Sequence, residues 1–517
     1  MSLRRSAFVT VMVMGCTLAT RLLGFVKIAL VGAIFGASGV ADVWNAVFTI
    51  PNNLRKLMAE GAMSSAFIPV LSASLLNDPG RQGAKKTTRA IMSFQLVLLV
   101  PLIGLGILFA EPVIHALLSF PQPEKMRLSA ELFRWIFGYL LLISVSAVLM
   151  GVLNSHNVFV IPALTPLLFS IAVIAATLIF WRSLGIFSLA VGILAGGAAQ
   201  ILFQLPTFFK LGYDLRLDFD YRHEQFKRVL KLWIPVLVSS SIFAINQQIA
   251  VLFASGLEDG STSALSNAVV FWQLPFGIFS SSIITVLFPR MSRQAAGEDR
   301  GGLRESVSYG LQFILILMIP ASIVYVLMGR QIIQVALERS AFTAQGTLMA
   351  ASVLTGYSLG MFSVAAFTFL QRFFYSRQDY RTPLAASLIV SALDIGFSLW
   401  LKETPLRVTG LAVANSLAFS AGTVILLKKA RAILGSLNGR MMLDTLLRMA
   451  VSNLPLVVFL PLFLQWTAPF WTRGSSLRNL LLLLAALAGG GGITLLLYYL
   501  TGIRMVRDVL PGRLAKR

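Results

Sequence analysis

The stretch IMSFQLVLLVPLIGLGILFA, residues 91–110, runs for twenty residues without a charged side chain. An α-helix of about 20 mostly apolar residues is long enough to cross the hydrocarbon core of a bilayer. A helix on the surface of a soluble protein instead keeps a polar face toward water. This stretch therefore predicts a membrane-spanning helix.

The whole chain has the same character. Of its 517 residues, 57% are hydrophobic and only 12% are charged, whereas a soluble domain carries about 25% charged residues. So little charge cannot cover a water-soluble surface, which excludes a soluble enzyme, a secreted disulfide scaffold and a disordered chain. The single cysteine, Cys16, also excludes an intrachain disulfide and a cysteine-based metal site.

Apolar windows between turn residues or charges mark the predicted spans. They cover residues 7–35, 42–72, 90–110, 132–154, 161–181, 185–209, 229–256, 264–289, 306–328, 347–371, 383–401, 408–427, 447–467 and 480–502. These windows predict an all-α polytopic membrane protein with about 14 transmembrane helices. The polar gaps between them are too short to fold as separate soluble domains.

The net charge of +22 is explained by topology. In a soluble protein it would suggest nucleic-acid binding, but the cytoplasmic loops of a membrane protein collect Lys and Arg. With the N-terminus inside, the inner segments hold 29 cations and the outer segments hold 9. This excess predicts that both termini are cytoplasmic and that no nucleic acid is bound.

The chain also contains an internal repeat at an offset of about 220 residues. Gly138-Tyr139 recurs as Gly356-Tyr357, and the turn 154–162 matches the turn 375–383. The repeat predicts two parallel six-helix halves related by a pseudo-two-fold axis along the membrane normal, a transporter architecture with the substrate between the halves. The predicted parts are residues 1–215, residues 225–432, and residues 440–517 with two additional helices and a basic tail.

Five cations lie in or beside the spans, and four of them fall in the first two. These four are Arg21, Lys27, Arg55 and Lys56, whereas Arg134 lies at a span end from which its side chain can reach the interface. A charge near the bilayer centre costs at least about 2.5–3.5 kcal/mol on insertion scales. The four cations are therefore expected to face a partner or a cavity.

Two carboxylates, Asp42 and Glu60, accompany these cations. Lys56 and Glu60 are four residues apart and can pair on one helix face, so a structural ion pair is one interpretation. The cations nevertheless outnumber the carboxylates by two, and excess buried positive charge predicts an entering anion or a wet cavity. Because Arg binds phosphate oxygens bidentately, a phosphorylated or pyrophosphorylated substrate fits better than a neutral drug.

The second half has polar groups in place of these charges. Asn246, Gln247 and Gln273 are the candidates for its cavity, although hydrogen bonding between helices is the simpler interpretation of these residues. The chain contains no P-loop, no dinucleotide-binding glycine motif and no acid–base constellation. The sequence therefore predicts no catalytic residue, no metal site, no cofactor and no use of ATP, and it identifies no coupling ion.

Several motifs resemble the MurJ/MviN family of the multidrug/oligosaccharidyl-lipid/polysaccharide exporter superfamily. They are TRLLGF (20–25), GA with AD (36–37, 41–42), PNNLRK (51–56), AEGA with AFIP (59–62, 66–69), LER (337–339), FYSRQD (374–379) and TP (382–383). The resemblance implies a flippase for lipid II, the undecaprenyl-pyrophosphate-linked peptidoglycan precursor. It also implies a multi-pass protein of the bacterial inner membrane.

The resemblance further implies site residues. Arg21, Lys27 and Arg55 match the family's cavity arginines, and Lys56 completes the expected pyrophosphate site. Asp42 and Glu60 match acidic residues of the same motifs and are expected to line or gate the cavity.

Two departures from the family pattern concern this site. Lys27-Ile28 stands where the family has Arg-Asp, and Val269-Val270 stands where it has Asp-Arg shortly before Pro275. The second departure removes an expected second-half contact to the pyrophosphate.

We therefore expect a lipid II flippase that works by alternating access and depends on membrane potential, with the lipid tail in a groove toward the last two spans. The expected partners are lipid II, the membrane and the cell-wall synthesis machinery, and the protein is expected to be a monomer. The alternatives are a flippase for another polyprenyl-linked saccharide and a non-transporting paralogue that acts as a scaffold for cell-wall synthesis. A drug antiporter for cationic drugs would need an acidic cavity, which is the opposite of this one.

Overall fold

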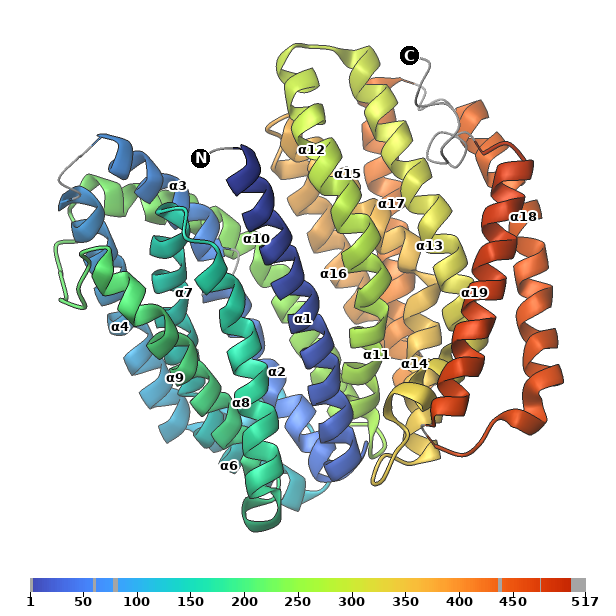
Figure 1. Ribbon diagram of the computed structural model, residues 1–517, viewed down its shortest axis with the longest axis horizontal. Helices are drawn as coiled ribbons and strands as arrows, with labels where there is room; N and C mark the ends of the chain where they lie inside the picture. The colour runs from blue at the N-terminus through green and yellow to red at the C-terminus, as the bar shows by residue number, and fades with distance from the viewer. Residues whose placement is uncertain (1–2, 59–61, 78–81, 436–438, 475, 504–517) are drawn as a thin grey trace. The chain divides into compact units, whose positions relative to one another are not determined.

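The computed structural model describes residues 3–58, 62–77, 82–435, 439–474 and 476–503, and all regular secondary structure in these ranges is helical (Figure 1). Contacts between helices divide the chain into two compact units, Met1–Thr262 and Ser263–Arg517. The predicted all-α membrane fold is thereby confirmed.

The first unit contains ten helices among its described residues. They are α1 (Leu3–Phe35), α2 (Val40–Met58), α3 (Ala62–Asn77), α4 (Gln82–Leu108), α5 (Ala110–Leu117), α6 (Pro123–Ile136), α7 (Tyr139–Ser155), α8 (Val160–Leu184), α9 (Phe187–Lys210) and α10 (Glu224–Ser255). The chain passes into the second unit at the start of the next helix.

The second unit holds the remaining helical segments. They are α11 (Ser261–Pro275), η1 (Phe276–Ser280), α12 (Ser281–Ala296), α13 (Arg300–Leu337), α14 (Ala344–Leu359), α15 (Met361–Ser376), α16 (Arg381–Leu401), α17 (Arg407–Leu434), α18 (Gly439–Thr467), η2 (Ala468–Phe470) and α19 (Leu477–Leu500).

Each predicted span coincides with one helix or with consecutive helices. Within the described residues, 11 helices are long and apolar enough to cross a membrane, or up to 12 when the bent pair α14–α15 counts as one span. The predicted windows 42–72 and 229–256 fall on α2–α3 and α10, which are not among them. The predicted number of about 14 is therefore approximate.

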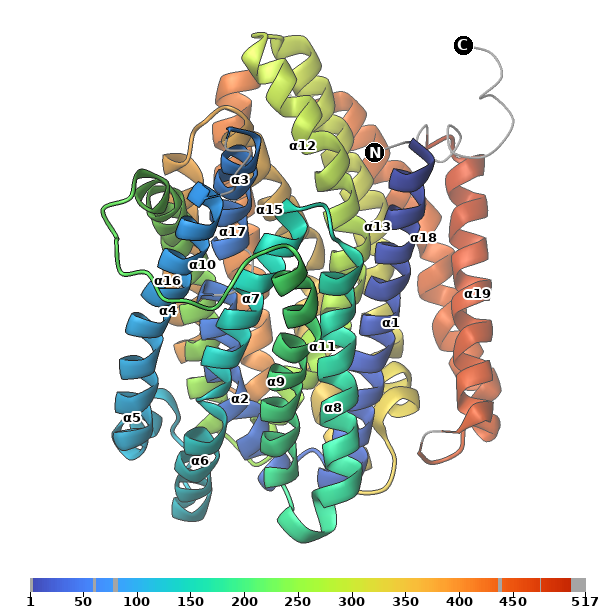
Figure 2. The same cartoon turned by 60° about the vertical axis from the view of Figure 1, so that its left-hand side comes forward.

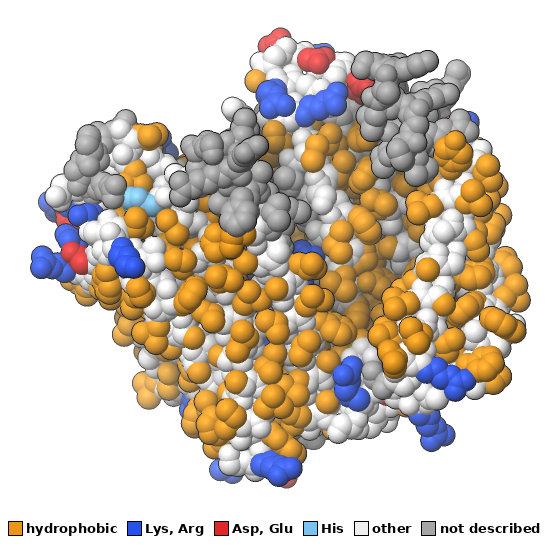
Figure 3. Space-filling model, in the orientation of Figure 1, with side chains coloured by type: hydrophobic (Ala, Val, Ile, Leu, Met, Phe, Trp, Pro, Cys, Tyr) orange, Lys and Arg blue, Asp and Glu red, His pale blue; other side chains and the backbone are white. Residues whose placement is uncertain are grey.

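Hydrophobic side chains cover most of the face shown in Figure 3, and the Lys and Arg side chains on it lie mainly toward the two ends of the helices. Such a surface suits a hydrocarbon environment with charged groups at its borders.

The repeat is visible in both local geometry and packing. Asn157 and Gln378 both have a φ of 60°, and both turns close with a backbone bond, 2.9 Å from Val158 N to Leu153 O and 3.1 Å from Asp379 N to Phe374 O. The helix pairs α7–α9, α8–α9 and α4–α7 of the first unit have counterparts in α15–α17, α16–α17 and α13–α15 of the second.

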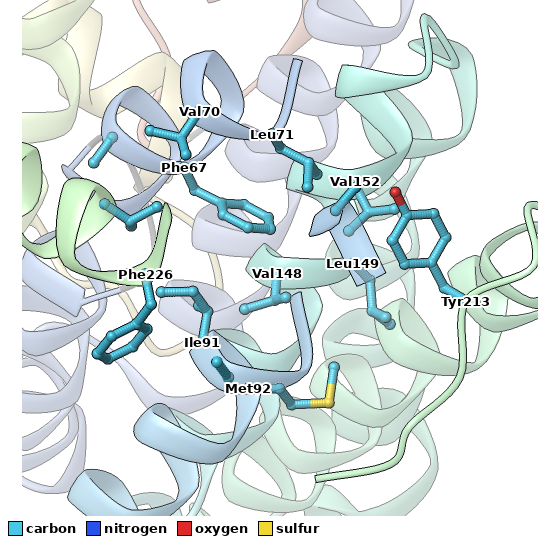
Figure 4. Packing of buried hydrophobic residues seen from close by; sticks show 14 of the residues in the cluster. Phe67, Val70, Leu71, Ile91, Met92, Val148, Leu149, Val152, Tyr213 and Phe226 are labelled. Atoms are coloured by element: carbon cyan, nitrogen blue, oxygen red, sulfur yellow. The ribbon is translucent and has the colours of Figure 1, made fainter. Parts of the chain in front are cut away.

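Helix α10 packs with the first unit, although the repeat begins before it. It lies against α2, α3 and α4, and its Phe226, Val229 and Trp233 join a buried cluster that includes Phe67 and Ile91 (Figure 4). This apolar burial holds α10 to the first unit. The first compact unit therefore ends at residue 262. The boundary predicted from the sequence lies earlier, between residues 215 and 225.

The two C-terminal helices pack on α13. Met328 of α13 shares a buried cluster with residues of α18 and α19. The amide of Asn453 donates to the Tyr498 hydroxyl at 2.9 Å, and that hydroxyl lies 3.5 Å from the carbonyl oxygen of Ile316. A polar contact within the bundle thus adds to the apolar packing of these helices.

A substitution at Gly360 tests the packing at the joint between α14 and α15. A Cβ there would lie 2.5 Å from Cα of Ser416, a backbone atom that cannot move aside easily. Gly360→Ala is expected to destabilise the protein by roughly 1–3 kcal/mol, measured as a lower Tm of the purified protein. Gly396→Ala is the control, because its Cβ would meet nothing within 4 Å, and an equal loss in both variants would contradict the packing argument.

Candidate functional site

The predicted cations on α1 and α2 gather in the first unit. Arg55 lies in the last turn of α2, where its Nε and Nη2 donate to Asn52 Oδ1 at 3.2 and 3.0 Å. The Lys27 ammonium of α1 lies 5.4 Å from the centre of the Phe169 ring. Arg55 lies close enough to both Lys27 and Lys56 for its positive charge to oppose each of theirs.

Helix α10 supplies polar partners to this cationic cluster, which we define as Lys27, Arg55 and Lys56. The Lys56 ammonium donates to Gln247 Oε1 at 3.1 Å. One turn earlier on α2, the Asn53 amide donates to the carbonyl oxygen of Ala244 at 3.4 Å. These bonds are available because α10 packs on α2.

Helix α2 continues through Pro51 without a break. The asparagine side chains beside this proline bind Arg55 and α10 and do not cap a broken helix. The polar run in α2 therefore orients side chains of the cluster.

The other predicted site residues lie at several places. Arg21 is exposed on α1, six residues and about 9 Å along the helix axis from Lys27. Glu60 lies outside the described residues, so its pairing with Lys56 stays a prediction. Asn246 lies on α10 with the first unit, whereas Gln273 is exposed on α11 in the second unit.

Asp42 is separate from the cationic cluster. It lies in the first turn of α2, thirteen residues and about 20 Å along the axis from Arg55. It is only 1% exposed, with the Thr262 hydroxyl 2.6 Å from its Oδ1 and the Lys125 ammonium 3.3 Å from its Oδ2. The structure thus pairs this carboxylate with groups at the opposite end of α2.

Lys125 of α6 connects the first turn of α2 with the loop after α10. Besides Asp42, its ammonium binds the carboxylate of Asp259, which also accepts the backbone N–H of Gly39 at 2.9 Å. Burial acts to raise the pKa of Asp259, but the bonds from Lys125 and Gly39 outweigh it and hold that pKa below its ordinary value. We call Asp42, Lys125, Asp259 and Thr262 the loop cluster.

The loop cluster joins positions that the repeat makes equivalent. Gly39 and Asp259 are 220 residues apart, and so are Asp42 and Thr262, which is the repeat offset. The two equivalent loops therefore meet each other directly. The sequence analysis missed Lys125 because it counted this residue as an ordinary cation of an outer loop. The repeat offset of about 220 residues was the available signal for the pairing of residues 42 and 262.

Asp394 is a second residue that sequence reasoning missed. It lies inside α16, is 7% exposed, and accepts from the Asn415 amide of α17 at 3.0 Å. A carboxylate in the middle of the predicted span 383–401 was the available signal, because a buried ionisable group within a span is costly and commonly functional. The second unit therefore has an intramembrane charge, although it is a carboxylate and not an arginine.

In the ranges that the structure describes, no group of three His, Cys, Asp or Glu side chains could hold a metal ion. The arrangement in the first unit is instead suited to an anion. Arg55 and two lysines offer charge-assisted donors, and Asn52 holds the guanidinium in one orientation.

Comparison with known sequences gives consistent matches. The family described as "Lipid II flippase MurJ" matches residues 31–482. A probable lipid II flippase MurJ of Borreliella burgdorferi is 34% identical over 416 residues, covering 80% of this chain and 81% of the relative. Another, of Buchnera aphidicola subsp. Schizaphis graminum, is 28% identical and covers 95% of this chain and 96% of its own.

Solved structures support the same fold. A structure described as lipid II flippase MurJ in an inward closed conformation has a TM-score of 0.77 and 24% identity, covering 96% of this chain and 99% of that one. An inward-facing multidrug resistance MATE transporter of the MOP superfamily has a TM-score of 0.64 and 14% identity, covering 81% and 96%. At these identities the structural likeness concerns the fold.

Proposed function

The chain belongs to the lipid II flippase MurJ family, and we propose that it moves lipid II across the bacterial inner membrane as a transporter. The observation that carries this proposal beyond family membership is the cationic cluster. Three positive groups of α1 and α2 lie near one another, and amide oxygens of Asn52 and Gln247 orient Arg55 and Lys56. Lipid II carries a pyrophosphate, and that anion would relieve the repulsion between the cations.

The cationic cluster and Arg21 form the proposed pyrophosphate site. The guanidinium of Arg55 would bind phosphate oxygens in a fixed orientation, and Lys27 and Lys56 would act as point charges. Desolvated contacts of this kind are stronger than the same contacts in water. Asn246, Gln247 and Gln273 remain proposed polar contacts to the sugar and peptide parts of the substrate, and Glu60 remains a proposed cavity carboxylate.

The loop cluster fits the outer closure that alternating access requires. With both termini in the cytoplasm, the loops at 36–39 and 256–260 face the opposite side of the membrane. Here Lys125 holds the loop after α10 against α2 and α6, and we propose that these bonds break when the outer end opens. Membrane potential would drive the cycle, at about 2.3 kcal/mol for each charge moved through 100 mV, with no cofactor and no enzymatic step.

We further propose that the protein acts as a monomer and meets the cell-wall synthesis machinery where lipid II is delivered.

A second candidate function is favoured by one observation. Val269 and Val270 on α11 replace the charged pair that the family pattern predicts, so the chain would be a non-transporting scaffold for the same machinery.

Depletion of the host's own lipid II flippase, followed by an assay of lipid II at the outer surface, distinguishes the flippase from the scaffold and from a flippase for another saccharide. In cells whose own lipid II flippase is depleted, expression of this chain is expected to restore growth and to return labelled lipid II to the outer surface. Restored growth without restored surface lipid II would indicate a scaffold. Surface accumulation of a different polyprenyl-linked saccharide, with lipid II unchanged, would indicate the other flippase.

A further inference from the structure

The segment between α9 and α10, residues 211–223, passes beside α4 (Figure 2), and acidic side chains bind it to that helix. We call this segment the linker strap. Arg89 Nε donates to Asp214 Oδ1 at 2.8 Å, and Lys86 Nζ lies 2.6 Å from Asp220 Oδ2. The hydrogen bonds from Arg89 and Lys86 hold the pKa values of Asp214 and Asp220 below the ordinary range. Both ion pairs are therefore intact at neutral pH.

The linker strap has no helix or strand between residues 213 and 220, and the backbone N–H groups of Arg216 and Asp220 bind the carboxylates of Asp214 and Asp218. While Asp214 and Asp220 bind α4, the residues between them expose apolar groups. Leu215 is 43% exposed, Leu217 is 47% exposed and Phe219 is 59% exposed. Three large apolar side chains are therefore exposed along the strap, and we call them the apolar row.

The position of the linker strap along the axis of α4 indicates what covers the apolar row. Ser93 Oγ accepts the backbone N–H of Asp218 at 2.8 Å, so the strap reaches the third turn of α4. The exposed apolar surface of the same helix begins at Val97, which is 53% exposed, only about 6 Å further along the axis. The apolar row of the strap thus borders the part of α4 that is expected to contact lipid.

Cations accompany the apolar row. Arg216 has 82% of its side chain exposed, and Arg222, Lys227 and Arg228 are also exposed on the strap and the first turns of α10. Apolar side chains flanked by cations are typical of segments that lie at the boundary between lipid headgroups and acyl chains. Asp220 is paired with Lys86 of α4. Asp214 is paired with Arg89 of α4 and also lies 4.0 Å from Arg216 Nε, so it offsets part of the Arg216 charge.

We propose that the linker strap is a membrane-surface anchor. Leu215, Leu217 and Phe219 enter the headgroup–acyl boundary of the adjacent leaflet, and Arg216 and Arg222 bind anionic lipid headgroups. The anchor holds the start of α10 at one depth while the strap stays bound to α4. This proposal depends on the membrane location of the chain but not on lipid II as the substrate.

Spin labelling of the full-length protein tests this placement. In a Cys16→Ser background, single cysteines replace Leu217 or Phe219, with Val97→Cys as the lipid-facing control and Glu298→Cys, in the exposed turn between α12 and α13, as the aqueous control. The labelled variants are reconstituted into vesicles of phosphatidylethanolamine and phosphatidylglycerol. At positions 217 and 219 the ratio of oxygen to aqueous nickel-reagent accessibility is expected to be several-fold above that at 298 and close to that at 97.

Two outcomes would overturn the proposal. A ratio at 217 and 219 equal to that at 298 would place the row in water, where a protein partner and not lipid would be needed to cover it. Equal label depth in vesicles with phosphatidylglycerol and in vesicles of neutral phosphatidylcholine would remove the role of anionic headgroups. Because neither measurement involves transport, the result is independent of the flippase activity.

Discussion

Replacing Arg55 with alanine is expected to reduce lipid II transport by about 10–100-fold and to abolish complementation. The variant loses charge-assisted hydrogen bonds to the pyrophosphate, each worth about 1.5–3 kcal/mol. It also removes one member of a repelling group of cations, so the folded protein is not expected to lose stability through that change. Surface exposure of labelled lipid II in flippase-depleted cells is the measurement, with membrane abundance recorded in parallel.

Two further substitutions separate charge from shape at this position. Arg55→Lys keeps the charge but loses the planar fork that Asn52 orients, so its activity is expected to fall between the wild type and the alanine variant. Arg127→Ala is the control, because the side chain of Arg127 is 85% exposed and is expected to have no role in transport. Normal transport by Arg55→Ala at normal abundance would refute the proposed pyrophosphate site.

Replacing Lys125 with glutamine is expected to open the loop cluster. The substitution removes the ammonium that lies 3.3 Å from Asp42, a side chain only 1% exposed. Removing one partner of a buried ion pair in this way costs about 3–5 kcal/mol. The two loops should then separate. Disulfide cross-linking between Ser38→Cys and Glu258→Cys, in the Cys16→Ser background, is expected to decrease strongly in the Lys125→Gln variant.

A rescue variant tests whether charge is the cause. Lys125→Gln combined with Asp42→Asn removes the uncompensated buried charge, so cross-linking is expected to recover in part, because the bond from Lys125 to Asp259 is still missing. Arg127→Gln on the same helix should not change it. If Lys125→Gln does not insert, Asp259→Asn supplies the same test at a half-exposed position. Unchanged cross-linking in inserted Lys125→Gln and Asp259→Asn variants would show that the ion pairs do not hold the loops.

The pH dependence of this contact has a defined direction. Because the folded-state pKa of Asp259 lies below 3.8, its ordinary value, the carboxylate adds stability above that pH and loses it as the pH falls through the lower folded value. The contact between the two loops is therefore expected to persist from neutral pH down to about pH 4. The measurement is the distance between spin labels at positions 38 and 258, because disulfide formation itself slows as the thiols become protonated.

Much of the fold was predictable because a membrane span has a strong local signal. Windows of about 20 apolar residues located the helices, and the repeat offset anticipated the matching turns at Asn157 and Gln378. The boundary of the first packing unit was not predictable in the same way. It depends on which helices α10 buries its Phe226 and Trp233 against, and this is a property of the assembled bundle.

The candidate site also has a part that could be predicted from the sequence and a part that could not. The sequence by itself predicted that Lys27, Arg55 and Lys56 lie in apolar windows, since a charge in such a window is detected without any knowledge of its neighbours. Only the tertiary structure decided that Asp42 pairs with Lys125 and Thr262, and that Gln247 binds Lys56. Hydropathy shows which residues along the chain lie in an apolar window. An ion pair depends instead on the distance between two helices, and that distance is set by how the helices pack.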